Sequence, residues 1–295
     1  MSSLYEFECI AHYCMGETDE ALRALNKALS LCEAESRTYI SLLREYGNIY
    51  YYSRNAWEYR EKICEKWDMA LTCYREKWEP SLNEDEIPSL QLHIATYFQA
   101  ALADMISDRQ EQAREKVELL SRYFGKTQMP YYEIKLRLLR ALYLIWNHLR
   151  AGGYLQTYEE IIRLLDQACD ECVIYYDVYD YTLCFCLRAI TQLHSGRYTT
   201  AADSYIKAAS ILQDSLNGPK EENVWAYFYK DMAYNLRKMN MEFPAVLWAG
   251  IRNPQVKAEV KKYLTSHREA EGEQDQPAVE TALADPDGEW YLPRL

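Results

Sequence analysis

The stretch GRYTTAADSYIKA, residues 196–208, decides the fold class of this chain. Gly196 is placed to end one helix, and the aromatic residue Tyr198 opens the next. Ala201, Tyr205 and Ala208 then recur at helical spacing, so they share one face of that helix. Small residues let the second helix approach the first closely, and the tyrosine fills the space between neighbouring pairs. The stretch therefore predicts two antiparallel helices joined by a tight glycine turn.

Helical patterns continue along almost the whole chain. Glycine and proline number only 10 and 9 in 295 residues, whereas an all-β chain needs turn residues at closer spacing. Breaks such as Gly152-Gly153 and Asn217-Gly218-Pro219 are short, so consecutive helices must turn back on each other. We expect an all-α stack of antiparallel helix pairs. The predicted helices are Leu4–Met15, Thr18–Leu31, Ser36–Tyr52, Ala56–Trp78, Pro88–Ile106, Arg109–Phe124, Pro130–Ala151, Leu155–Tyr176, Tyr179–Ser195, Tyr198–Ser215, Glu221–Met239, Phe243–Ala249 and Pro254–Thr265.

The 196–208 pattern resembles the second helix of the tetratricopeptide repeat (TPR). Gly16, Ala21, Leu25 and Ala28 repeat its spacing, and a third such helix is indicated by Ala70-Leu71 and Tyr74. The segment Tyr46-Gly47-Asn48-Ile49-Tyr50 resembles the Leu-Gly-x-x-Tyr signature of a first helix. The units are irregular in length and in signature. The resemblance implies a TPR-like α-α superhelix, or solenoid, over residues 1–265, with the first helix of each pair lining its concave face.

The charge of the chain is unevenly distributed. Residues 266–295 hold eight acidic residues against Arg268 and Arg294, and so carry half of the net charge of −12. This segment lacks a periodic apolar face, so we expect an acidic, disordered C-terminal tail. Its last residues, Trp290–Leu295, are apolar and aromatic, which fits a motif that docks on a partner or in the protein's own groove. Packing on the last helix is the alternative.

Composition and topology signals exclude several classes of protein. An acidic chain lacks the clustered cationic surface that nucleic-acid binding needs, so we expect no nucleic-acid partner. No window holds the ~18 consecutive apolar residues of a membrane span, and Met1–Glu8 does not read as a signal peptide. The nine cysteines lie within apolar helical runs and are expected to be reduced. These features predict a cytoplasmic, reducing location.

Signals for chemistry are weak. The phosphate-binding glycine loops and the metalloprotease and hydrolase motifs are missing, and the five histidines are scattered. We therefore expect no enzyme, no catalytic residue and no cofactor. Cys169-x-x-Cys172 with Cys184-x-Cys186 fits one zinc site poorly, because Cys184 and Cys186 point about 200° apart on a helix. Buried thiols, with no metal site, are the expected state.

The implied geometry places Arg44, Asn48, Tyr51 and Tyr52 on or near the concave face. Arg44 and Asn48 are four residues apart, so they lie side by side on one helical face. Peptide-clamping TPR domains use a cation and an asparagine at these relative positions, and both side chains suit a peptide chemically. The next unit offers Ala95, Phe98 and Gln99 in place of the other clamp positions. An ordinary solvated helix face is the alternative for this pair.

A second stripe lies near the C-terminal end of the repeats. Tyr227, Lys230, Tyr234 and Arg237 have the spacing of one helical face and are candidates for peptide contact, a solvated outer face being the alternative. In the middle units the corresponding positions are apolar, and we expect these side chains to pack in the core: Leu138, Leu142, Leu183 and Ile190.

The function that these features favour is a non-catalytic adaptor that binds a protein or peptide on its concave face. One alternative is a stand-alone peptide-sensing regulator, related to bacterial regulators in which a similar superhelix is joined to a DNA-binding domain. Another is an enzyme with an unfamiliar all-α site. The sequence specifies neither the partner nor the oligomeric state.

Overall fold

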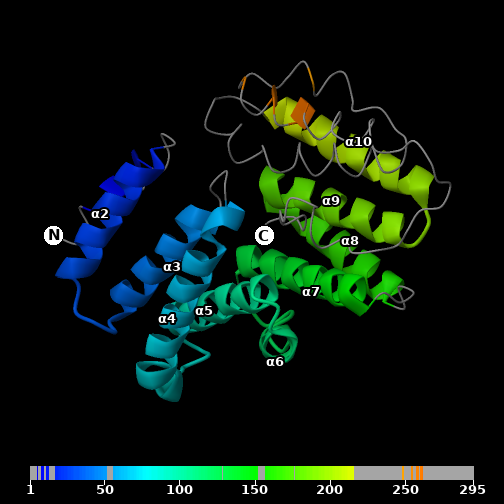
Figure 1. The fold of residues 1–295 in the computed structure, drawn as a ribbon. Coiled ribbons are helices and arrows are strands. Elements are labelled where there is room, and N and C mark those ends of the chain that lie inside the picture. The colour runs from blue at the N-terminus through cyan, green and yellow to red at the C-terminus, as the bar shows by residue number, and fades with distance from the viewer. Residues whose placement is uncertain are drawn as a thin grey trace. The chain divides into compact units, whose positions relative to one another are not determined.

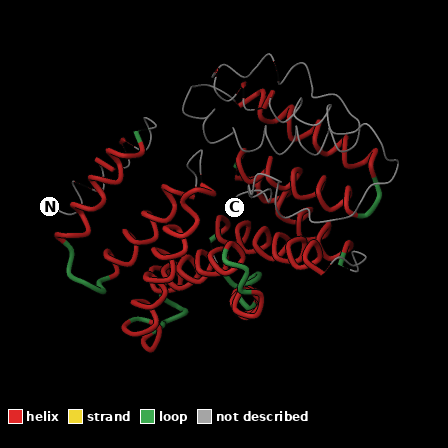
Figure 2. The backbone as a smooth tube through the Cα atoms, viewed as in Figure 1, coloured by secondary structure: helices red, strands yellow, loops and turns green. Residues whose placement is uncertain are grey.

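The computed structural model describes residues 5, 8–9, 11–12, 17–51, 56–127, 129–151, 157–175 and 177–215, with positions 248, 254, 257, 258, 260 and 261. Within these ranges the backbone forms nine α-helices and two 3-10 turns, with no strand (Figure 1 and Figure 2). The all-α expectation is therefore confirmed for this part of the chain. The predicted helices before residue 17 and after residue 215, and the acidic tail, lie almost entirely outside the described residues.

The chain divides into two compact units, and the first covers Met1–Tyr123. Each of its helices packs on the next, and α3 also contacts α5 across the chain segment that holds α4. Helices α3 and α5 therefore lie side by side, and α4 packs against both. The elements are α2 (Thr18–Leu31), α3 (Arg37–Tyr51), η1 (Ala56–Tyr59), α4 (Arg60–Lys77), η2 (Glu79–Ser81), α5 (Ile87–Ile106) and α6 (Gln110–Ser121).

The second unit, Phe124–Leu295, repeats this arrangement in its described part. Its helices are α7 (Pro130–Ala151), α8 (Tyr158–Tyr175), α9 (Val178–His194) and α10 (Tyr198–Ser215). Consecutive helices pack on each other, and α7 also contacts α9. Consecutive packing with short connections is the antiparallel pairing that the sequence predicts.

The glycine turn between α9 and α10 follows from the sequence. Gly196 has a φ of 70°, a left-handed conformation that residues with a Cβ rarely adopt. The amide of Arg197 donates to the carbonyl of Gln192 at 2.9 Å, and the amide of Gly196 donates to that of Leu193 at 3.0 Å. These two bonds form a Schellman motif, which satisfies carbonyls that the end of α9 leaves unpaired. The predicted stop signal is confirmed.

The repeated small and aromatic residues form the buried faces of the helices. Ala201, Tyr205 and Ala208 of α10 are fully buried, and so are Ala21, Leu25 and Ala28 of α2 and Ala70 and Tyr74 of α4. Because alanine adds little bulk, the helix backbones approach closely and the aromatic rings fill the remaining volume. The four apolar residues expected in the core of the middle units are buried as predicted: Leu138, Leu142, Leu183 and Ile190.

The segment predicted as one helix, Ala56–Trp78, is different in the structure. A 3-10 turn, η1, precedes α4, and its last residue, Tyr59, is outside the α-helical region, with φ −101° and ψ 8°. The ring of Tyr59 packs on that of Tyr50 in α3, with 4.6 Å between centroids. We attribute the break to this tertiary contact, which local helical pattern does not reveal. None of the described helices combines the length and the apolar composition needed to cross a membrane.

Candidate binding site

The contact between α3 and α5 joins the predicted pair Arg44 and Asn48 to a third polar side chain. Arg44 Nε donates to Oε1 of Gln99 at 2.6 Å, and Gln99 Nε2 donates to Oδ1 of Asn48 at 2.6 Å. The amide of Gln99 thus lies between the two α3 side chains and is bonded to both. We call Arg44, Asn48 and Gln99 the polar seam.

The polar seam lies at the boundary between core and solvent. Gln99 is only 6% exposed, whereas Arg44 and Asn48 are half-buried. The amide group of Asn48 also donates through Nδ2 to Oε1 of Glu45 at 3.2 Å. Since each amide is held by a bond on either side, the three side chains are fixed in one geometry before any ligand binds.

Packing beneath α3 fixes the position of Arg44. The indole of Trp67 in α4 donates through Nε1 to the backbone carbonyl of Arg44 at 3.2 Å. This approach requires Gly47, because a Cβ there would lie 2.3 Å from Nε1 of Trp67. Gly47 of α3 therefore makes room for an aromatic ring of α4, and that ring holds the backbone that carries the polar seam.

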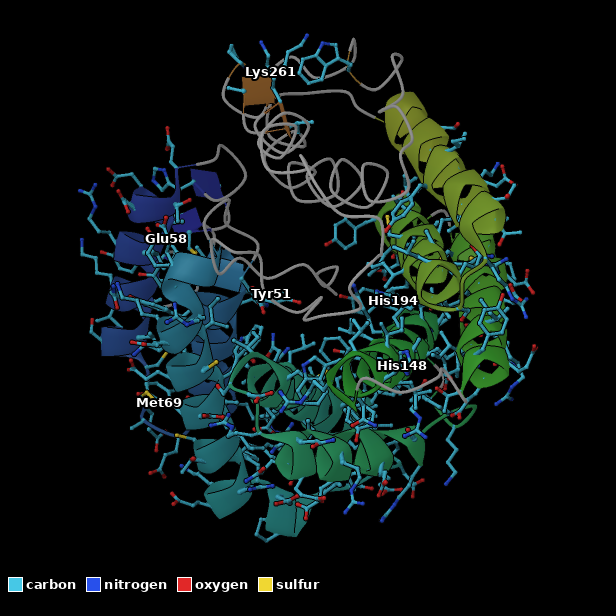
Figure 3. All side chains as sticks on the ribbon, turned by 45° about the vertical axis from the view of Figure 1, so that its right-hand side comes forward. Tyr51, Glu58, Met69, His148, His194 and Lys261 are labelled. Carbon is cyan, nitrogen blue, oxygen red and sulfur yellow. The ribbon has the colours of Figure 1, made fainter. Side chains whose placement is uncertain are left out.

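Of the other predicted site residues, the structure describes only Tyr51. Tyr51 is buried, and its ring packs on that of Trp67 with 5.1 Å between centroids, so it supports the contact between α3 and α4. Figure 3 shows Tyr51 and the exposed Met69 of α4 on opposite sides of this helix pair. The remaining candidates lie outside the described residues: Tyr52, Tyr227, Lys230, Tyr234 and Arg237.

Sequence reasoning names Gln99 but gives it no role in the site. It occupies the next unit at a position where a peptide clamp would be expected, and it looked like a departure from the pattern. The structure shows that it bridges the two α3 side chains instead. The signal available in the sequence was a polar residue directly before the apolar run Ala100–Ala103.

A second polar cluster joins three helices of the first unit. The buried carboxylate of Asp104 in α5 accepts from Arg109 Nε at 2.7 Å and from Nζ of Lys116 in α6. Arg109 also binds both carboxylate oxygens of Asp68 in α4, at 2.8 and 3.0 Å. Two cations therefore compensate the buried charge of Asp104, which makes this cluster a structural link between α4, α5 and α6.

His93 of α5 lies in an aromatic cluster. Its Nδ1 is 3.0 Å from the hydroxyl of Tyr74, and its ring packs against those of Tyr97 and Tyr123. Burial lowers the pKa of His93 below its ordinary value and raises that of Tyr123 to about 12. Both groups are therefore neutral near pH 7, and the cluster packs α4 against α5.

The cysteines of the second unit are close together but reduced. Cys184 of α9 lies beside Cys169 and Cys172 of α8, and burial raises its pKa well above the ordinary value. Thiolate is the form that binds metal, and burial disfavours it. Among the described residues, no group of three or more potential ligands is placed to hold a metal ion.

Comparison with known proteins gives no relative. No protein-family model matches the chain, and no curated protein or solved structure matches it.

Proposed function

We propose that this chain is a TPR-like adaptor that binds an extended segment of another protein, with the polar seam at the centre of its peptide-binding face. The observation that carries the proposal is the Arg44–Gln99–Asn48 bridge between α3 and α5. The repeat resemblance makes both of them first helices. In a TPR-like superhelix, first helices line the concave surface, and this surface is where such proteins hold their ligands. The proposal therefore joins the repeat resemblance to a polar cluster on the expected face.

The chemistry of the polar seam suits a peptide backbone. Asparagine and glutamine carry one acceptor and two donors, the same groups that an extended peptide presents. Asn48 uses one lone pair of Oδ1 for Gln99 and one N–H for Glu45. Its amide group therefore keeps hydrogen-bonding capacity on each atom. Because Asn48 is half-buried, a ligand backbone can reach that capacity from solvent.

Each residue has a distinct role in this proposal. Asn48 contacts the ligand backbone, and Arg44 provides positive charge for an acidic group of the ligand. Gln99 is too buried for extensive ligand contact, so it positions the other two side chains. Preorganisation of this kind raises affinity, because little side-chain entropy is lost on binding.

The test compares proteins captured from a lysate by the full chain and by three variants. Asn48→Ala removes the contact residue and Gln99→Ala removes the positioning residue. Gln112→Ala, at an exposed position of α6, is the matched control. We expect the first two variants to lose a shared set of proteins that the control retains.

The captured protein is then cut into peptides, and their affinities are measured by calorimetry. We expect at least a tenfold loss of affinity for Asn48→Ala, equivalent to about 1.4 kcal/mol. If all three variants capture the same proteins with unchanged affinity, the polar seam is not the binding site.

A further inference from the structure

Three cysteine side chains of the second unit meet where α8 packs against α9. Cys169 and Cys172 are three residues apart in α8, so they share one face of that helix, and Cys184 belongs to α9. Each of the three is buried, and each is a free thiol. The thiol of Cys184 interacts with those of both Cys169 and Cys172. The proposed adaptor function uses none of these thiols.

The pairing of the two helices places Cys169 opposite Cys184. Helices α8 and α9 pack on each other as antiparallel neighbours, because only two residues separate the end of α8 from the start of α9. Farther from this connection, Asp166 of α8 forms an ion pair with Arg188 of α9. One turn from that pair toward the connection, α8 carries Cys169 and α9 carries Cys184. The ion pair therefore sets a register in which these two thiols face each other.

The two facing thiols differ in exposure. Cys169 is 9% exposed, whereas Cys184 is completely buried, so a small oxidant meets Cys169 first. Burial, and then the interactions with the two α8 thiols, raises the pKa of Cys184 well above its ordinary value. Because the thiolate is the nucleophile in thiol chemistry, Cys184 reacts slowly. We therefore expect the pair to respond to sustained oxidation and to stay reduced otherwise.

We propose that Cys169 and Cys184 form a redox switch, in which a peroxide converts the two facing thiols into a disulfide that ties α8 to α9. Hydrogen peroxide oxidises the Cys169 thiol to a sulfenic acid, and one water is released. The Cys184 sulfur then attacks the sulfenic sulfur, so that the S–S bond forms and a second water leaves with the Cys184 proton. One peroxide and two thiols thus give one disulfide and two waters.

The disulfide changes how readily the two helices open. It closes a loop of about 15 residues, and so removes conformational freedom from every state in which α8 and α9 are separated. Local opening of this pair should therefore become rarer, while the folded state keeps the contacts it already has. Both helices belong to the second unit and the polar seam belongs to the first, so the switch does not depend on the proposed function.

The test treats the folded, full-length chain with graded hydrogen peroxide. Remaining thiols are then blocked, and the unreduced peptides are mapped by mass spectrometry. We expect a cross-linked peptide pair that contains Cys169 and Cys184, and its loss after treatment with dithiothreitol. Hydrogen exchange in residues 158–194 should be at least about tenfold slower in the oxidised chain, with no change in residues 60–77 of the first unit.

Two substitutions in α9 give a matched comparison. Cys184→Ala should abolish both the cross-link and the slower exchange. Cys186→Ala is the control, because Cys186 is equally buried in the same helix but points about 200° away from Cys184. It should retain both effects. Mapping of the unsubstituted chain stands alone as a test if either variant fails to fold.

Three results would overturn the proposal. The first is the absence of the Cys169–Cys184 cross-link from the oxidised, folded chain. The second is a cross-link from Cys184 to Cys172 in its place, because the register set by Asp166 and Arg188 would then be wrong. The third is slower exchange that persists in Cys184→Ala, because oxidation would then act through another residue.

Discussion

Gly47→Ala gives the sharpest test of how α3 is built. Alanine is favoured over glycine inside a helix by about 1 kcal/mol, so local propensity alone predicts a more stable protein. The structure predicts the opposite, because the new Cβ would lie 2.3, 2.5 and 2.9 Å from three atoms of the Trp67 indole. Two effects of opposite sign therefore compete at one position, and their magnitudes decide the result.

The steric effect should win. Overpacking of a filled core costs about 1–3 kcal/mol. If the indole moves away instead, its buried N–H loses the carbonyl of Arg44, which costs about 1–3 kcal/mol. After subtraction of the propensity gain of about 1 kcal/mol, we expect Gly47→Ala to reduce the free energy of unfolding by up to about 2 kcal/mol. The polar seam should shift as well, because Arg44 is held by the same indole.

Hydrogen exchange measured by mass spectrometry is the suitable assay, because it resolves the opening of α3 and α4 from that of the rest. We expect faster exchange in residues 37–77 of the variant. The double variant Gly47→Ala with Trp67→Leu removes the clash, so its loss should be at least about 1 kcal/mol smaller than the sum of the single losses. Unchanged or slower exchange in Gly47→Ala would refute the reasoning, since propensity would then dominate.

Three further substitutions test the buried polar groups, and a fourth, Asp68→Asn, is a control. Burial lowers the pKa of His93 below its ordinary value of about 6.5, so the unfolded chain takes up this proton before the folded chain does as pH falls. The free energy of unfolding of the wild type should therefore decrease at pH values under about 6.5, by up to about 1.4 kcal/mol per pH unit. Urea titrations of His93→Phe should not show this decrease. Lys135→Met, which removes the buried partner of Asp180, should cost about 3–5 kcal/mol at pH 8 and less as the pH is lowered, because burial already raises the pKa of Asp180 and its carboxyl group becomes neutral as pH falls; a loss that does not change with pH would contradict this. Asp104→Asn should cost about 2–4 kcal/mol in thermal or urea unfolding because Lys116 keeps a buried charge. Asp68→Asn removes the half-buried carboxylate that pairs with Arg109, and this loss should cost no more than about 1 kcal/mol.

The helices could be predicted where start and stop signals are local. The predicted bounds of Thr18–Leu31, Pro130–Ala151 and Tyr198–Ser215 agree with α2, α7 and α10. Their ends are marked by a glycine turn, a proline at the first helical position or an abrupt loss of the apolar pattern. The break before Arg60 was not predictable, because it depends on the ring contact between Tyr50 and Tyr59 in different elements.

The candidate site was predictable in part for the same reason. Spacing alone places Arg44 and Asn48 on one face of a helix, and the structure has both side chains half-buried at the α3–α5 contact. The bridge through Gln99 depends on the relative offset of two helices 51–55 residues apart in the chain. No local signal encodes that offset, because it is set by the way in which α3 and α5 each pack on α4.

The indole of Trp67 also makes the protein its own optical reporter. The ring is almost completely buried, and its N–H is bonded to the carbonyl of Arg44, whose side chain belongs to the polar seam. A ligand that displaces Arg44 changes the electric field at the indole, so the fluorescence emission maximum of Trp67 should shift when a ligand occupies the polar seam. Subtracting the spectrum of a Trp67→Phe variant isolates that signal from the other tryptophans, and binding can then be followed without a label.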